Sequence, residues 1–188
     1  MFDYIYKTTN NINGKVEDSM GKKSIVVIEG PDGVGKSTLV NYLVDTYDYK
    51  MYHSSSETAN DMGYHLDLLD KPEDKIVLDR CNLGEIVYPI VYGREPKMTN
   101  EEQEEFMREC ERRDVIYIIF YASDFNTLKE RLFKRGDTQQ VLDNAEKINE
   151  VFKDLAEQLE YTFSNVYTLD ISKESDQIAF FQKILLQK

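Results

Sequence analysis

The sequence predicts an α/β fold in which helices cover both faces of a five-stranded, mostly parallel sheet. Two observations lead to this prediction. Runs of apolar residues, such as those at 24–29 and 115–122, are typical of strands that are buried on both faces. These runs alternate with segments of helical pattern, and strands that alternate with helices form parallel sheets with right-handed crossovers. The 188 residues are enough for one domain with a single core.

The first half of the chain contributes three strands and two helices. The strands are expected at 24–29, 49–53 and 75–78. The helices are expected at 36–47 and 58–69. In the second of these helices, Asp61 stands at capping-box spacing from Thr58.

The second half adds two strands and five helices. The strands are expected at 115–122 and 165–169. The helices are expected at 83–92, 99–112, 124–134, 138–161 and 173–186. Pro89 should break or kink the first of them, because proline lacks the backbone N–H that a helix interior uses. Thr99 and Glu102 have the spacing of a capping box at the start of the second.

The composition limits the kinds of partner. The formal net charge is −12, and a nucleic-acid backbone needs a basic surface, so we expect no stable nucleic-acid binding. A small substrate in a locally basic cleft remains compatible with this charge. The two cysteines, Cys81 and Cys110, have no second Cys or His at metal-ligand spacing. They are therefore expected to be reduced thiols, with neither a disulfide framework nor a zinc site.

Residues 1–23 are polar after a short aromatic patch, and we expect a flexible extension before a folded domain at 24–188. The alternative is an arm that docks its aromatic residues on the domain or on a neighbouring subunit. The segment lacks the basic and apolar stretches of a signal peptide. The longest apolar run, 115–120, is too short to span a bilayer. We therefore expect a soluble, cytoplasmic protein with no membrane partner.

The segment GPDGVGKS at 30–37 fits the pattern G-x-x-x-x-G-K-[ST], which is the phosphate-binding P-loop. The loop follows a predicted buried strand and opens a predicted helix, as the motif requires. The glycines let the backbone approach phosphate oxygens, while the loop N–H groups and the helix N-terminus form an anion site. Lys36 would reach the β- and γ-phosphates, and the Ser37 hydroxyl would reach Mg²⁺. The expected nucleotide-binding residues are Gly30, Asp32, Gly33, Val34, Gly35, Lys36, Ser37 and Thr38.

Three polar segments follow the ends of predicted strands. They are the P-loop at 30–37, the His-Ser-Ser-Ser run at 53–56, and Asp79-Arg80. Ligands of parallel α/β sheets bind at the carboxyl ends of the strands. We therefore expect the three segments to meet in one cleft.

Two stretches together, IEGPDGVGKST at 28–38 and LDRCNLGEIVY at 78–88, resemble the thymidylate kinase family, particularly its short phage-type members. The resemblance extends over about residues 24–172. It implies a three-layer α/β/α P-loop fold with strand order 2-3-1-4-5 and a helical lid at about 124–137. It also implies ATP and Mg²⁺ as cofactors and hints at a homodimer. A phage-encoded member would act in the host cytoplasm.

Four residues stand at the spacings of the family's acceptor site, namely Asp32, Asp79, Arg80 and Tyr88. Asp32 would contact a ribose hydroxyl, as the resemblance implies, or else form the turn before Gly33. Asp79 would hold Mg²⁺ through water or accept a proton from a hydroxyl acceptor; the alternative is a helix N-cap. Arg80 offers a planar fork for an acceptor phosphate.

The alternative role for Arg80 is a structural ion pair with Asp79 or Glu85. Tyr88 would stack on or flank the acceptor base, or else pack in the core. Arg131 and Arg135 lie one helical turn apart, in a segment that resembles the family's lid. They would neutralise charge on the transferring phosphoryl group, and some family members have a catalytic arginine at the position of Gly33. The alternative is a solvated basic surface.

The sequence also departs from the family. After the second strand these kinases have R-E-P, whereas this chain has His53 followed by three serines, which would bind phosphate as neutral donors. We treat Gly93–Pro96, which reads G-R-E-P, as unrelated because it follows the third strand. The expected function is ATP- and Mg²⁺-dependent phosphoryl transfer to a (deoxy)nucleoside monophosphate, thymidylate or a related one. The alternatives are a deoxynucleoside 5′-kinase, in which Asp79 is the base, and a nucleotide-binding protein or NTPase without a kinase substrate.

Overall fold

The computed structural model describes residues 23–187, except residues 56 and 59. The predicted extension at 1–23 lies outside the described residues, apart from Lys23. Within the described part of the chain, no helix is both long enough and apolar enough to cross a membrane.

Five parallel strands form one sheet in the order β2-β3-β1-β4-β5, as predicted. The strands are β1 (Ser24–Glu29), β2 (Lys50–His53), β3 (Lys75–Asp79), β4 (Ile116–Tyr121) and β5 (Val166–Asp170). The central strand β1 is buried from Ile25 to Glu29, which explains why this segment is apolar on both faces. In the register of β1 and β3, Ile28 lies opposite Asp79. The ends of these two strands therefore lie side by side.

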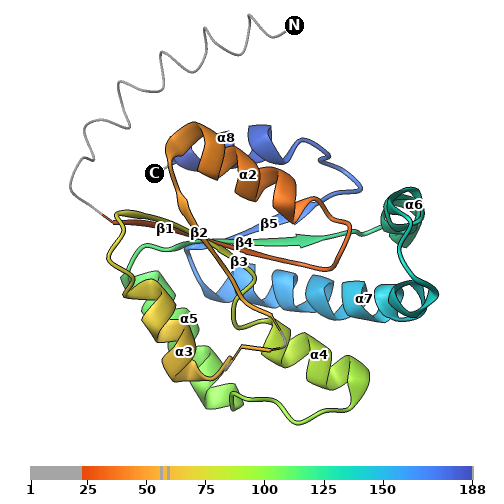
Figure 1. The fold of residues 1–188 in the computed structure, drawn as a ribbon, viewed down its shortest axis with the longest axis horizontal. Helices are drawn as coiled ribbons and strands as arrows, with labels where there is room; N and C mark the ends of the chain where they lie inside the picture. The colour runs from red at the N-terminus through yellow and green to blue at the C-terminus, as the bar shows by residue number, and fades with distance from the viewer. Residues whose placement is uncertain (1–22, 56, 59, 188) are drawn as a thin grey trace, which may run out of the picture.

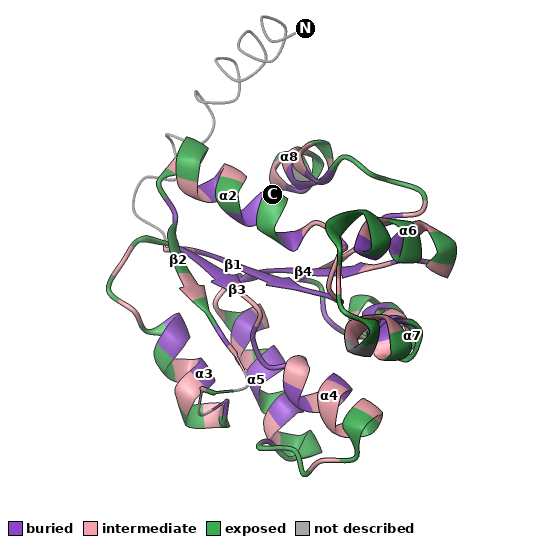
Figure 2. Cartoon of the chain, turned by 45° about the vertical axis from the view of Figure 1, so that its right-hand side comes forward, coloured by how far each residue is buried: buried purple, intermediate pink, exposed green. Residues whose placement is uncertain are grey.

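Helices cover both faces of the sheet, so the predicted three-layer α/β/α fold is confirmed (Figure 1). One layer contains α2 (Lys36–Tyr47) and α8 (Gln177–Gln187). The other contains α3 (Met62–Leu69), α4 (Gly84–Tyr92), α5 (Asn100–Arg112) and α7 (Gln139–Thr162). Alternate residues of β1 enter two apolar clusters, with Ile25 and Val27 in one and Val26 and Ile28 in the other. Figure 2 shows the buried sheet between the two helical layers.

The remaining helix, α6 (Phe125–Arg135), lies at one end of the sheet (Figure 1). It ends at Gly136, whose φ of +79° is a left-handed conformation that glycine adopts without strain. Leu128 and Leu132 of α6 are fully buried, so one face of the predicted lid packs on the domain. The separation of α6 and α7 at Gly136-Asp137 agrees with the sequence-based prediction.

Two helix starts predicted from the sequence were wrong. The helix expected from residue 58 begins only at Met62, because Asn60 has a left-handed φ of +52° and Asp61 caps the helix by accepting from the N–H of Tyr64. The last helix begins at Gln177, where the Asp176 carboxylate accepts from two backbone N–H groups of the first turn. The sequence predicted a break or a kink at Pro89, and α4 is not broken there: the helix runs from Gly84 to Tyr92 with Pro89 inside it.

Candidate functional site

The carboxyl ends of β1, β2 and β3 bring the three polar segments together. A cavity of about 430 Å³ lies there. Its walls are formed by Asp32, Gly33, Gly35, Lys36, Ser37, His53, Asp79, Arg80, Arg131 and Arg135. Four of these side chains are cationic (Lys36 and the three arginines), so the cavity is a locally basic site on an acidic protein. Such a site attracts phosphate groups.

The P-loop turns tightly against β4 at its first glycine. Gly30 has a φ of +140°, and a Cβ atom placed on it would lie 2.6 Å from the carbonyl oxygen of Phe120. That oxygen belongs to the backbone of a central strand and has little freedom to move. The close approach of these two chain segments therefore requires glycine at position 30.

Replacing Gly30 with alanine is expected to destabilise the fold by about 3 kcal/mol, since backbone strain and a steric clash act together. Gly136 is the matched control: its φ is also positive, but no atom lies within 4 Å of its hypothetical Cβ. Gly136→Ala should therefore lower stability by only about 1 kcal/mol. Urea denaturation of both variants measures the difference, and equal losses would contradict the steric explanation.

Lys36 is the central cation of the cavity. It is 7% exposed, and its ammonium donates to the carbonyl oxygens of Gly30 at 2.8 Å and Pro31 at 2.7 Å. Burial, together with the nearby positive charge of Arg80, lowers the pKa of Lys36 to about 8. The loop itself thus solvates the ammonium at the place where phosphate oxygens would bind.

The other predicted P-loop residues occupy different positions. Ser37 lies exposed on the cavity wall, whereas Thr38 lies on the exposed side of the first turn of α2. The side chain of Val34 is fully buried, and its carbonyl oxygen accepts from Gln177. Val34 could therefore bind a phosphate only through its backbone N–H group.

Asp32 and Arg80 form the polar centre of the site. The guanidinium of Arg80 donates to the Asp32 carboxylate at 2.6 Å, and its other terminal nitrogen lies 3.5 Å from the Tyr88 hydroxyl. The alternative ion pairs of Arg80 with Asp79 or Glu85 are not the ones that form: Glu85 pairs with Arg94. Asp32 is thus more than a turn former. Arg80 thus contacts both Asp32 and Tyr88, so three of the four residues that the sequence placed at the acceptor site lie together.

Asp79 pairs with His53, whose Nδ1 lies 3.0 Å from one carboxylate oxygen. The other oxygen, Oδ1, is buried and has no hydrogen-bond partner within the described part of the chain. Asp79 does not cap α4, because the N-cap of that helix is Leu83. Asp79 and Ser37 line the same cavity, and their oxygen atoms are of the kind that a hard cation such as Mg²⁺ prefers. The described residues contain no cluster of three or more metal-binding side chains, so most ligands of such a cation would be phosphate oxygens and water.

Arg131 and Arg135 of α6, the segment predicted to be a lid, both line the first cavity. Arg131 donates to the carbonyl oxygen of Val34 at 3.4 Å. Arg135 donates to the two oxygens of the Asp137 carboxylate through Nε and one terminal nitrogen, each at 2.7 Å. A Cβ atom at Gly33 would lie 2.7 Å from Leu132 of the same helix. An arginine at position 33 would require the Leu132 side chain to move and would be strained by the φ of +82°. The positive charge at this wall comes from α6 instead.

A second cavity, of about 510 Å³, adjoins the first and shares Asp32 and Arg80 with it. Tyr88 and Tyr92 of α4 line this cavity, and their rings stack with centroids 6.1 Å apart. Ser54 and Ser55, which follow β2, line the second cavity, whereas His53 lines the first. Gly30, predicted as a nucleotide contact, also lines the second cavity.

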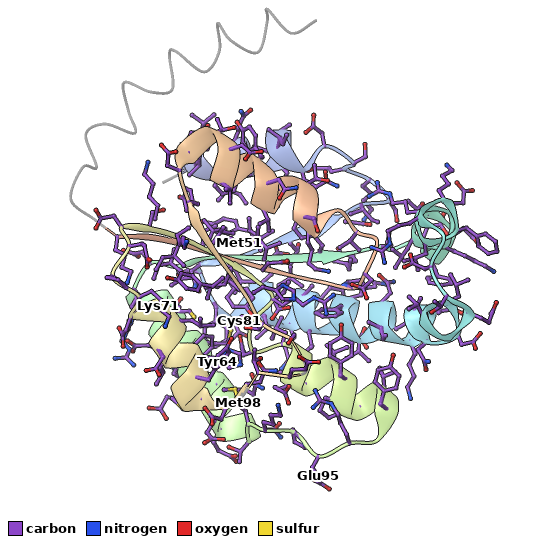
Figure 3. All side chains as sticks on the ribbon, in the orientation of Figure 1. Met51, Tyr64, Lys71, Cys81, Glu95 and Met98 are labelled. Atoms are coloured by element: carbon purple, nitrogen blue, oxygen red, sulfur yellow. The ribbon has the colours of Figure 1, made fainter. Side chains whose placement is uncertain are left out.

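Arg94 is a residue of the second cavity that the sequence-based interpretation missed. It donates to the buried carboxylate of Glu85 at 3.0 Å and lines the cavity. Its neighbour Glu95, labelled in Figure 3, is exposed in the loop after α4. The stretch Gly93–Pro96, treated as unrelated because of its place in the chain, thus supplies an arginine to the site. The turn of α4 at Gly93, with a φ of +66°, brings the chain back towards the cavity.

Comparison with known proteins establishes the fold. No family model matches the chain, and no curated protein matches it by sequence. The YorR protein of Bacillus subtilis, solved with phosphorylated GDP, superposes with a TM-score of 0.68 at 23% identity, over 87% of this chain and 95% of that one. Deoxyadenosine kinase of M. mycoides with bound dATP superposes with a TM-score of 0.56 at 18% identity, over 86% of this chain and 98% of that one. The chain has the fold of P-loop nucleotide kinases.

Glu29 is the second residue that sequence analysis did not single out. It is the last residue of β1 and is 1% exposed. Its Oε1 accepts from the backbone N–H groups of Cys81 at 2.8 Å and Leu83 at 3.0 Å, and the residue is part of the wall of the second cavity. A carboxylate at the end of an otherwise apolar strand was the available signal. Burial raises the pKa of Glu29 to about 7, although the two N–H groups and the nearby cations Lys36 and Arg80 act in the opposite direction.

This raised pKa predicts a pH dependence of stability. An acid that holds its proton more tightly in the folded state adds stability below its unfolded pKa of about 4.5, and this contribution is lost as the pH rises through about 7. Relative to Glu29→Gln, which does not titrate, the wild type should therefore lose stability between pH 5 and pH 8. Thermal unfolding of both proteins across this range measures the difference. Parallel curves would contradict the prediction.

Proposed function

We propose that this protein transfers the γ-phosphoryl group of ATP, with Mg²⁺, to a (deoxy)nucleoside monophosphate, with thymidylate or a related deoxynucleotide as the acceptor. One observation carries the proposal. The P-loop cavity and the tyrosine-lined cavity meet at Asp32 and Arg80. A donor phosphate in the first and an acceptor in the second would face each other across these two side chains. Direct transfer between two bound nucleotides needs such an arrangement.

The chain supplies the charges that the transfer requires. Lys36 and the first-cavity arginines would stabilise the negative charge on the transferring group. Ser37 and Asp79 would hold Mg²⁺, which neutralises charge on the triphosphate when it is bound. Arg135 would exchange Asp137 for a phosphate oxygen. Little proton transfer is needed, because the acceptor is already a phosphate.

The second cavity has the features of an acceptor site. Arg80 would bind the acceptor phosphate through its planar fork, in place of part of its contact with Asp32. Asp32 would then be free to accept from a ribose hydroxyl. Tyr88 and Tyr92 offer apolar ring surface to a base, and Ser54 and Ser55 offer neutral donors.

A deoxynucleoside 5′-kinase is the second candidate, and the Asp79–His53 pair favours it. A hydroxyl acceptor must lose a proton. Asp79 lines the cavity proposed for the donor, and one of its carboxylate oxygens has no hydrogen-bond partner within the described part of the chain. This oxygen would accept the proton while His53 orients the carboxylate. In this reaction Asp79→Asn would abolish turnover, whereas a monophosphate kinase would lose only its contribution to Mg²⁺ binding.

A coupled assay of ADP release distinguishes the candidates. Each common deoxynucleoside and each deoxynucleoside monophosphate is added separately to the protein with Mg-ATP, and phosphorylated products are identified by mass spectrometry. We expect turnover with one or more monophosphates and little with nucleosides. The reverse pattern would favour the nucleoside kinase. ADP release that no acceptor stimulates would identify an NTPase and refute both proposals.

A further inference from the structure

The turn after β3 is an unusual support for a substrate-binding arginine. Arg80 has a φ of +70°, a left-handed conformation that is unfavourable for a residue with a side chain. Its own N–H donates to the carbonyl oxygen of Ile28 at 3.0 Å. Such a conformation persists only where the surrounding structure holds it. The contacts on the other side of Arg80 therefore matter for where its guanidinium lies.

Glu29 provides those contacts. One of its two carboxylate oxygens, Oε1, accepts from the N–H groups of both Cys81 and Leu83, which are the first and third residues after Arg80. Cys81, labelled in Figure 3, marks the position of this turn. Leu83 is the N-cap of α4 and makes no side-chain cap of its own. The carboxylate thus replaces the missing local cap and holds the turn to the end of β1.

The same residue lies directly before the P-loop. Glu29 is followed by Gly30, so its backbone leads directly into the P-loop, while its side chain holds the turn that carries Arg80. A shift between β1 and the turn after β3 would change the distance between Lys36 and Arg80. The side chain of Glu29 limits such a shift.

We infer that Glu29 is a positioning residue for phosphoryl transfer: by holding the backbone at Cys81 and Leu83, it keeps the guanidinium of Arg80 in place for the acceptor phosphate. The inference rests on the proposed function, in which Arg80 binds the acceptor. It predicts that the reach of the side chain matters more than its charge. One oxygen receives both N–H groups, and a neutral amide oxygen at the same place can accept both as well.

Two substitutions separate reach from charge. Glu29→Gln keeps the oxygen at its position and removes the charge, whereas Glu29→Asp keeps the charge and shortens the side chain by one methylene. We expect Glu29→Asp to raise the KM of the acceptor at least about tenfold, with the KM of ATP changed less than about threefold. Glu29→Gln should leave both within about threefold of the wild type.

Asn165→Ala is the matched control. Asn165 is buried and donates to the carbonyl oxygen of Val115, at the opposite ends of the strands. Its removal should lower the melting temperature without changing the KM of the acceptor. An unchanged acceptor KM in Glu29→Asp would overturn the inference. So would an acceptor KM raised equally in both Glu29 variants, or a rise that affects ATP and acceptor alike.

A structural measurement keeps the inference separate from the proposed function. If the wild type phosphorylates no acceptor, the proposed function fails, and crystal structures of the two variants then decide the role of Glu29. We expect the Arg80–Asp32 ion pair to be retained in Glu29→Gln and to be displaced or broken in Glu29→Asp. An ion pair that is unchanged in Glu29→Asp would overturn the inference.

Discussion

Replacing Lys36 with alanine is expected to lower kcat for phosphoryl transfer by about 10³-fold or more. Lys36 is the most buried cation of the first cavity, and its ammonium is held by two carbonyl oxygens of the loop that would surround the phosphates. Its charge acts on the group whose negative charge shifts during the reaction. The loss corresponds to about 4 kcal/mol of transition-state stabilisation.

The effect should be on the reaction rather than on folding. Burial lowers the pKa of Lys36 to about 8, so its positive charge is disfavoured in the folded protein, and removing the charge should not by itself lower stability. Lys183→Ala, at an exposed lysine that pairs with Glu174, is the control and should behave like the wild type. Initial rates at saturating substrates and thermal unfolding measure both quantities. Substantial turnover by a well-folded Lys36→Ala protein would refute the assignment of the site.

Replacing Arg80 with alanine is expected to lower kcat/KM for the acceptor by about 10²-fold, or about 3 kcal/mol, with little change in the binding of Mg-ATP alone. Arg80 lines both cavities, and its guanidinium lies 3.5 Å from the hydroxyl of Tyr88. Its planar fork suits a phosphate, which a lysine would bind only as a point charge. Arg80→Lys should therefore recover only part of the loss.

Arg108→Ala is a suitable control, because Arg108 also forms an ion pair, with Glu104, but on the exposed surface of α5. Calorimetry with Mg-ATP and steady-state kinetics with the preferred acceptor separate the two binding events. A loss of ATP affinity as large as the loss of acceptor affinity would place Arg80 on the donor side instead.

Local patterns in the sequence predicted most of the fold. The apolar run of β1 and the capping box at Thr99 each depend on residues close together in the chain, and both are confirmed. The errors in predicting where helices start arose at residues whose conformation depends on a distant contact or on a single backbone angle. Asn60 illustrates this: its buried amide donates to the carbonyl oxygen of Ser55 and approaches Glu85, and its left-handed backbone delays the start of α3.

The residues of the candidate site also fall into those that local sequence reveals and those that only packing reveals. The P-loop could be recognised from contiguous residues because its chemistry depends on a short run of backbone N–H groups and one lysine. The roles of Glu29 and Arg94 could not, since their partners are determined by packing. Glu29 contacts Cys81 and Leu83, which are more than 50 positions away in the chain. Arg94 follows the left-handed end of α4 and pairs with the buried Glu85 at the cavity.

The sequence by itself determined the order of strands and helices, the phosphate-binding loop, and the presence of Asp79-Arg80 after the third strand. Only the tertiary structure decided that Arg80 pairs with Asp32, that Asp79 pairs with His53, and that the two cavities meet between them. The physical reason is the range of the interactions. Periodicity, caps and loops are set by neighbours along the chain, whereas these pairs depend on the register of β1, β2 and β3 in the sheet.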